Sequence, residues 1–125
     1  MKDIPKISES EWLVMKVLWA RSSATANEVI EALSDKTSWN PKTTRTLLGR
    51  LVRKKALGFE RHGREYHYFP LVSEHTCVRA ESRSFLKRVY GGSLRPMLAA
   101  FLQEQNLSQE EISELKRILD EKGRR

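Results

Sequence analysis

Residues 39–70 read WNPKTTRTLLGRLVRKKALGFERHGREYHYFP, a stretch in which the spacing of the apolar residues changes once. The first half begins with Asn40, a favoured N-cap residue. Pro41 follows it, and proline suits the first helical position because the N–H of that position has no partner within a helix. Beyond Pro41 the apolar side chains recur every three or four positions, which predicts an amphipathic helix.

The two faces of this predicted helix differ in chemistry. At 100° per residue, the inward face comprises Thr44, Leu47, Leu48, Leu51 and Lys55. The opposite face comprises Lys42, Thr46, Gly49, Arg50 and Arg53, flanked by Thr43 and Arg45. A glycine costs a helix about 1 kcal/mol relative to alanine, so Gly49 on the cationic face suggests close approach by another surface.

The second half of the stretch has the residue pattern of a β-hairpin. Residues 57–61 and 64–69 are predicted to form two strands around a tight turn in which Gly63 supplies the positive φ. Arg61 and Arg64 flank this turn, so the tip of the hairpin is expected to be cationic.

Three other segments open with a capping box, in which a hydroxyl and a carboxylate three residues later satisfy free backbone N–H groups. The pairs are Ser8 with Glu11, Thr25 with Glu28, and Ser108 with Glu111. The first two pairs predict helices over about residues 8–20 and 25–35. Their inward residues are predicted to be Trp12, Met15, Leu18 and Trp19 in the first helix and Val29, Ile30 and Leu33 in the second.

The distribution of charge singles out the same region. The 125 residues include 23 Lys and Arg against 16 Asp and Glu, for a formal net charge of +7. Residues 41–64 hold eight of the basic residues and one acidic residue, so the whole excess lies there and the rest of the chain is neutral. A local basic patch indicates a polyanionic partner, although a basic helix face taken alone can also be merely solvated.

Three helices followed by a two-stranded hairpin is the order of a winged helix-turn-helix. The predicted fold class is mainly α with a small β wing: a winged helix-turn-helix DNA-binding domain over residues 1–72 and a helical dimerisation region over residues 73–125. In such a domain the third helix lies in the major groove of double-stranded DNA and the hairpin touches the backbone. The predicted DNA-binding residues are Lys42, Thr43, Arg45, Thr46, Arg50, Arg53, Arg61, Arg64 and Tyr66.

From Ser73 onwards the pattern is helical again. Gly91 and Gly92 interrupt it, Ser93 can cap the continuation, and a last helix begins at Ser108. These segments carry more apolar surface than a few short helices bury alone, so a homodimer is expected. The predicted dimerisation residues are Phe85, Leu86, Val89, Tyr90, Leu94, Met97, Leu98, Phe101, Leu102, Ile112, Leu115, Ile118 and Leu119.

The sequence offers no catalytic motif. A nucleophile elbow, a P-loop and a dinucleotide fingerprint are all missing, so no enzyme is expected. The histidines and Cys77 fall short of the density of a zinc site, so neither a metal nor another cofactor is expected. No apolar run spans a membrane or follows the N-terminus as a signal peptide, and the single cysteine suits a reducing compartment, so a cytoplasmic protein is expected.

Several runs together resemble the penicillinase-repressor family, which includes BlaI and MecI and, as a branch, the copper-responsive CopY repressors. The runs are Ile7–Trp19, Thr25–Ile30, Trp39–Leu57, Gly63–Pro70, Phe85–Leu94 and Leu107–Glu121, which cover essentially the full chain. The resemblance implies a homodimeric winged-helix transcriptional repressor that binds a palindromic operator, here of β-lactamase or other β-lactam-resistance genes. It also implies that residues 73–125 form the dimerisation region.

The resemblance bears on the releasing signal as well. Copper-responsive members end in a Cys-x-Cys motif, which a chain with Cys77 as its one cysteine cannot supply. The β-lactam branch implies a membrane sensor-protease that cuts an Asn-Phe bond. The matching dipeptide is Ala100-Phe101, which lacks the Asn, and Phe101 also suits a dimer core beside Met97 and Leu98. Release is therefore expected by proteolysis or by another signal.

Two alternatives stay open at this point. The basic segment alone would also suit a sequence-neutral nucleic-acid-binding or ribosome-associated module. A repressor of the same family with a different inducer, for example a metal-linked one, is the other alternative.

Overall fold

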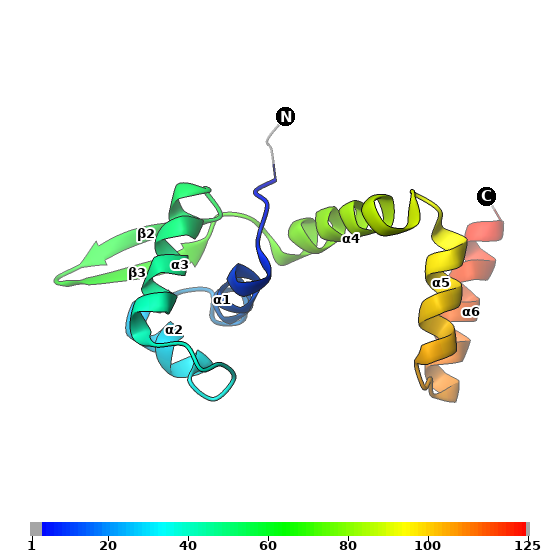
Figure 1. Ribbon diagram of the computed structural model, residues 1–125, viewed down its shortest axis with the longest axis horizontal. Coiled ribbons are helices and arrows are strands. Elements are labelled where there is room, and N and C mark those ends of the chain that lie inside the picture. The colour runs from blue at the N-terminus through cyan, green and yellow to red at the C-terminus, as the bar shows by residue number, and fades with distance from the viewer. Residues whose placement is uncertain (1–3, 125) are drawn as a thin grey trace. The chain divides into compact units, whose positions relative to one another are not determined.

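The computed structural model describes residues 4–124, so residues 1–3 and residue 125, the outer ends of the two predicted regions, lie outside it. The described residues form six helices and three short strands (Figure 1). In chain order these are α1 (Glu9–Arg21), β1 (Ala24–Thr25), α2 (Ala26–Leu33), α3 (Pro41–Arg53), β2 (Leu57–His62), β3 (Glu65–Pro70), α4 (Glu74–Tyr90), α5 (Leu94–Glu104) and α6 (Gln109–Gly123).

The chain divides into two compact units, Met1–Glu81 and Ser82–Arg125. This division lies within α4, whereas the sequence placed it between residues 72 and 73. The first turns of α4 belong to the N-terminal unit because Cys77 is buried in its core. In addition, Lys16 Nζ of α1 lies 2.5 Å from Glu74 Oε2 of α4.

The N-terminal unit encloses one apolar core, to which α1, α2, α3 and the sheet contribute. Its most deeply buried side chains include Val14, Met15, Leu18, Val29, Leu33, Leu48, Leu51 and Leu57. Burying one such side chain contributes about 1.5–3 kcal/mol, so this core holds α2 and α3 together. Trp12 and Trp19, predicted to face inward, pack at the edge of the core, and Ile30 is only half-buried.

The predicted helix starts are confirmed by their hydrogen bonds. All three capping boxes are complete. Asn40 caps α3: its side chain accepts a hydrogen bond from the Thr43 amide, and Pro41 is the first residue of the helix. Ser93 precedes α5 as predicted, but its side chain makes no capping hydrogen bond. Pro96 occupies the third helical position and has no N–H to donate, which removes one of the two donors such a cap can use.

The sheet has three antiparallel strands in the order β1-β3-β2. Strand β1 was not predicted, because two residues are too few to show alternation. It pairs Ala24 with Tyr68 and Thr25 with His67 of β3, which ties the start of α2 to the hairpin. Gly63 has the predicted positive φ of 66°.

Two predicted details are wrong. Strand β3 begins at Glu65, so Arg64 belongs to the turn instead of the second strand. Lys55 does not share the buried face of α3: the helix ends at Arg53, and Lys55 is exposed with a φ of 67°. This left-handed residue reverses the chain so that Ala56 and Leu57 enter the core.

The C-terminal unit contains the later turns of α4 together with α5 and α6. No residue of α5 or α6 is fully buried. The Phe85 ring stacks on Phe101 with centroids 6.2 Å apart. Gly91 and Gly92 end α4 as predicted, and both have a positive φ. Among the described residues, no helix combines the length and the apolar character needed to cross a bilayer.

Candidate nucleic-acid interface

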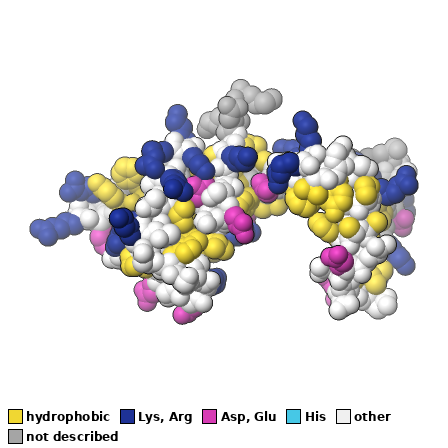
Figure 2. All heavy atoms as spheres, viewed as in Figure 1, with side chains coloured by type: hydrophobic (Ala, Val, Ile, Leu, Met, Phe, Trp, Pro, Cys, Tyr) yellow, Lys and Arg dark blue, Asp and Glu magenta, His cyan; other side chains and the backbone are white. Residues whose placement is uncertain are grey.

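Helix α3 has the two faces that the sequence predicts. Thr44, Leu47, Leu48 and Leu51 are buried against the core. The outward side chains Lys42, Arg45, Thr46, Arg50 and Arg53 are exposed, and Figure 2 shows Lys and Arg side chains along this part of the N-terminal unit. The predicted cationic face is therefore free of contacts with the core.

A shallow groove runs along the first turns of this face. It has a volume of about 320 Å³ and is lined by Asn40, Lys42, Thr43, Thr46, Leu47 and Arg50. Thr43 is half-buried. Its hydroxyl donates a hydrogen bond to Asn40 Oδ1 over 3.2 Å, so the hydroxyl proton is already used by the N-cap residue. The groove thus combines cationic and hydroxyl side chains.

Gly49 leaves a flat place on the same face. A Cβ built on Gly49 would meet one neighbouring atom, Arg53 Nη1, at 3.7 Å. Packing within the chain therefore does not require a glycine here. The space left open by the missing Cβ of Gly49 would let another molecular surface approach α3 closely.

The wing consists of β2, β3 and their turn, and one of its faces is aromatic and cationic. In the strand register Phe59 faces Tyr68 and Arg61 faces Tyr66. Tyr66 is 45% exposed, and its ring lies 5.0 Å from that of Phe59. Arg61 Nε donates to the Gly63 carbonyl over 2.9 Å, which holds this arginine at the turn.

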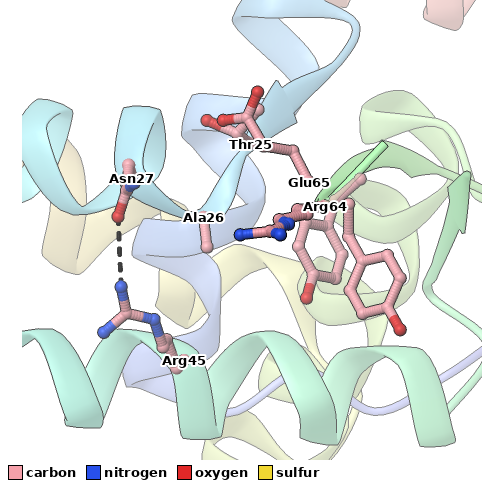
Figure 3. A pocket seen from close by; sticks show the side chains of 8 residues that line it. Thr25, Ala26, Asn27, Arg45, Arg64 and Glu65 are labelled. Carbon is pink, nitrogen blue, oxygen red and sulfur yellow. Dashed lines mark hydrogen bonds between the residues drawn. The ribbon is translucent and has the colours of Figure 1, made fainter. Parts of the chain in front are cut away.

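A pocket of about 270 Å³ joins α2, α3 and the wing. Its lining residues are Thr25, Ala26, Asn27, Arg45, Arg64, Glu65, Tyr66 and Tyr68. Arg45 Nη2 donates to Asn27 Oδ1 over 3.1 Å, and Arg64 extends from the wing towards the start of α2 (Figure 3). Burial raises the pKa of Tyr68, the neighbouring Tyr66 adds to the rise, and the charge of Arg45 opposes it.

The structure thus places Arg45, Arg64 and Tyr66, three of the predicted DNA-binding residues, around one pocket, and adds the start of α2, which has no role in the sequence-based prediction. The sequence predicts Thr25 to be a helix cap alone and assigns no role to Asn27. The pairing of β1 with β3 places both beside the wing. A two-residue strand leaves no pattern from which this could have been predicted.

Lys54, one of the eight basic residues of the segment 41–64, is engaged elsewhere and is not available at the cationic face of α3. Lys54 Nζ lies 2.5 Å from Glu11 Oε1 and donates to the Lys6 carbonyl over 2.8 Å. Glu11, predicted from the sequence as the carboxylate of a capping box, is 1% exposed. Burial raises the pKa of Glu11, but the hydrogen bonds from Lys54 and Ser8 and the charge of Lys54 outweigh burial and leave that pKa below its ordinary value.

The histidines and the cysteine are arranged without a metal-binding geometry. His62 and His67 have ring centroids 4.5 Å apart, and His62 Nε2 lies 3.2 Å from Glu60 Oε2. Within residues 4–124 no group of three or more His, Cys, Asp and Glu side chains could hold a metal ion. Cys77 is buried, and burial raises the pKa of its thiol, which disfavours the reactive thiolate.

An apolar groove lies in the C-terminal unit. It has a volume of about 460 Å³ and is lined by Leu94, Leu98, Leu102, Leu115, Ile118 and Leu119 together with Glu121 and Lys122. Leu119 is 59% exposed and Ile118 48%. Of the other predicted dimerisation residues, Val89 and Phe101 are exposed, and the half-buried ones are Phe85, Leu86, Tyr90, Met97 and Ile112.

The dipeptide Ala100-Phe101 lies inside α5, with Phe101 at the start of the last turn of that helix. Ala100 is half-buried, and Phe101 is exposed except where its ring stacks on Phe85. A protease needs an extended segment, so this bond becomes accessible only after local unfolding of α5.

Comparisons with known proteins agree with this geometry. The penicillinase repressor family model matches residues 7–121. A penicillinase repressor of Bacillus licheniformis is 47% identical over 121 residues, which cover 97% of this chain and 94% of that protein. The methicillin resistance regulatory protein MecI of Staphylococcus aureus is 36% identical over 94% of this chain and 95% of its own length.

A solved structure extends the comparison to the fold. The solution structure of the Bacillus licheniformis BlaI monomeric form in complex with the blaP half-operator shares 49% sequence identity with this chain and has a TM-score of 0.53. The match covers 59% of this chain and 90% of that one. Together with the order of helices and strands, it confirms the predicted winged helix-turn-helix fold.

Proposed function

This chain belongs to the penicillinase repressor family, and from that premise we propose that it represses transcription as a homodimer bound to a palindromic DNA operator. One observation carries the proposal: helix α3 is apolar and buried on one face, and cationic and exposed on the other. The solved complex of a 49% identical repressor with its half-operator supports DNA as the ligand.

Helix α3 is proposed to enter the major groove. The groove admits a helix, and an arginine can donate two hydrogen bonds to O6 and N7 of a guanine. Arg45 and Arg50 are exposed and suited to this role. Lys42, Thr43, Thr46 and Arg53 are proposed to contact neighbouring base edges or phosphates.

The wing is proposed to grip the DNA backbone. Arg61 is held at the turn, and Arg64 and Tyr66 line the pocket beside α2. Backbone contacts fix the register of a protein on DNA, and each neutralised phosphate releases counterions. The salt dependence of binding is therefore expected to be steep.

The C-terminal unit is proposed to form the dimer. Helices α5 and α6 bury no residue fully within one chain, and the apolar groove between them includes Leu119 and Ile118, both about half exposed. A two-fold interface would cover the groove of each copy. The dimer would then set the spacing between the two half-sites of the operator.

The names of the relatives guide the proposal for the regulated genes. One is a penicillinase repressor and another a methicillin resistance regulatory protein, so the genes proposed for this chain are those of β-lactam resistance. A membrane sensor-protease is the inducer that the family implies, and Ala100-Phe101 is the matching bond. The missing Asn and the stacking of Phe101 on Phe85 favour a dimer-core role for Phe101 and another releasing signal.

We propose that the protein binds DNA and catalyses no reaction. The protein is expected in the cytoplasm, where its proposed ligand, DNA, lies. A sequence-neutral nucleic-acid-binding module is the alternative, and the basic segment alone would satisfy it.

The experiment that separates these functions is a mobility-shift series at increasing salt. The probes are a palindromic duplex from the region upstream of the gene for this chain and a scrambled duplex of the same composition. A repressor is expected to prefer the palindrome by about a thousandfold or more, and to keep that preference as salt rises. Equal affinity for both duplexes, with one common salt dependence, would support the sequence-neutral module instead.

A further inference from the structure

We propose that Asn27 is a positioning residue for DNA recognition, which orients the Arg45 guanidinium and thereby determines the base pair that Arg45 selects. The proposal rests on the proposed function and assigns a role to α2 in sequence recognition. Its basis is the hydrogen bond from Arg45 Nη2 to Asn27 Oδ1, 3.1 Å long, which links α3 to α2 (Figure 3).

The backbone of Asn27 is held in place by its surroundings, while its side chain is exposed. It lies in the first turn of α2, where the Thr25 amide donates to Glu28 Oε1 over 2.8 Å and the Glu28 amide donates to Thr25 Oγ1 over 3.2 Å. Thr25 also pairs with His67 of β3, and Val29 and Leu33 fix α2 in the core. An acceptor on a rigid element can fix the orientation of a flexible partner.

Arg45 is the flexible partner. It is exposed on α3, and an exposed arginine samples many rotamers, so ordering it upon binding DNA carries an entropic cost. A hydrogen bond that already holds the guanidinium in the free protein reduces that cost. It also limits the directions in which the remaining donors point.

The chemistry of the acceptor suits this role. A guanidinium has five N–H donors in one plane, and the bond to Asn27 uses one donor of Nη2. The others remain available for the two acceptors of a guanine edge. Because the asparagine side chain is neutral, it orients Arg45 without cancelling its charge or repelling a DNA phosphate.

Arg50 provides an internal comparison. It lies on the same face of α3, yet within residues 4–124 no hydrogen bond from its side chain is found, whereas Arg45 is held by Asn27. Loss of the Asn27 amide should therefore disturb recognition at the base pair selected by Arg45 and leave the one selected by Arg50 unchanged.

The experiment is a selection from a duplex library with a randomised central segment, using the full chain, Asn27→Ala, Arg45→Ala and Arg50→Ala. The parent chain should enrich a palindromic consensus. Asn27→Ala should lose preference, by about tenfold, at the same position in each half-site as Arg45→Ala, and not at the position lost in Arg50→Ala. Asn27→Asp, which keeps the acceptor oxygen, should retain the preference at that position even where its charge weakens overall binding.

Two controls keep the result specific. Asn106→Ala changes an asparagine between α5 and α6 and should leave every position as in the parent chain. The double variant Asn27→Ala with Arg45→Ala should show no loss beyond Arg45→Ala alone, because Asn27 acts through Arg45. Thermal unfolding of each variant checks that the fold is kept.

The outcomes that overturn the proposal differ from those that overturn the proposed function. A parent-like consensus from Asn27→Ala, or a loss spread evenly over all positions, would show that Asn27 does not orient Arg45. A parent chain that enriches no consensus would instead contradict the proposed function.

Discussion

Lys54 Nζ, just beyond the end of α3, lies 2.5 Å from Oε1 of the buried Glu11 in the first turn of α1. The same carboxylate oxygen accepts from the Ser8 amide over 2.9 Å, and Lys54 also donates to the Lys6 carbonyl. The pair therefore ties the chain before α1 to the end of the proposed recognition helix. Removing one partner of a buried pair is costlier than the pair is stabilising.

Glu11→Gln is expected to lower the free energy of unfolding at pH 7 by about 1–3 kcal/mol, because it leaves Lys54 without its charged partner. The pKa of Glu11 is lowered in the folded protein from an ordinary value of 4.5, so its contribution is present above that value and is lost as pH falls through the folded pKa. Denaturant unfolding at pH 7 and at pH values below 4.5 checks this, with the exposed Glu9→Gln as control. A loss that is the same at every pH would contradict the role of the ionised pair.

Gly49→Ala is expected to stabilise the protein and weaken its binding to DNA. Alanine favours a helix interior by about 1 kcal/mol over glycine, and its methyl group meets only Arg53 Nη1 at 3.7 Å. The same methyl group lies on the face proposed to approach DNA. Thermal unfolding and operator titration measure the two effects, and Gly123→Ala at the end of α6 is the control. Operator affinity equal to that of the parent chain would show that nothing approaches Gly49 closely.

Leu119→Glu is expected to give a folded monomer. Leu119 is 59% exposed in one chain and lines the apolar groove, so a carboxylate there would be buried without a partner in the proposed dimer. Light scattering measures the mass, and circular dichroism checks the fold. Lys116→Glu, which adds negative charge to α6 at a residue that does not line the groove, should remain dimeric. A dimeric Leu119→Glu would place the interface elsewhere.

The parent chain is expected to stay intact when a sensor-protease of its family is co-expressed and a β-lactam is added, because the bond before Phe101 follows Ala100 instead of Asn. Ala100→Asn restores the dipeptide and is expected to yield a fragment that ends near residue 100. A blot against the N-terminal unit distinguishes the two. A fragment of that size from the parent chain would show that Ala100-Phe101 is cleaved and that the Asn is not required.

Features that depend on neighbouring residues were predicted from the sequence. The faces of α3 and the three capping boxes follow from spacings of three or four residues, and these predictions are confirmed. The end of α3 was misplaced because Lys55 adopts a left-handed conformation without the glycine that usually marks one.

Features that join distant parts of the chain left no such pattern. Glu11 and Lys54 are 43 residues apart, and Asn27 and Arg45 are 18 apart, so no periodicity connects either pair. Strand β1 exists because β3 lies beside it, and two residues carry no alternation of their own. The core determines these contacts, and the order of residues alone does not reveal them.

The most direct test of the central claim measures binding of the parent chain, Arg45→Ala and Arg50→Ala to the palindromic duplex upstream of the gene, at one fixed salt concentration. If the exposed face of α3 reads the operator, each variant is expected to lose about 1–3 kcal/mol of binding free energy, which is roughly tenfold or more in affinity. Both variants should fold as the parent chain does, because neither side chain is buried. If both bind the palindrome as tightly as the parent chain, α3 does not read the operator.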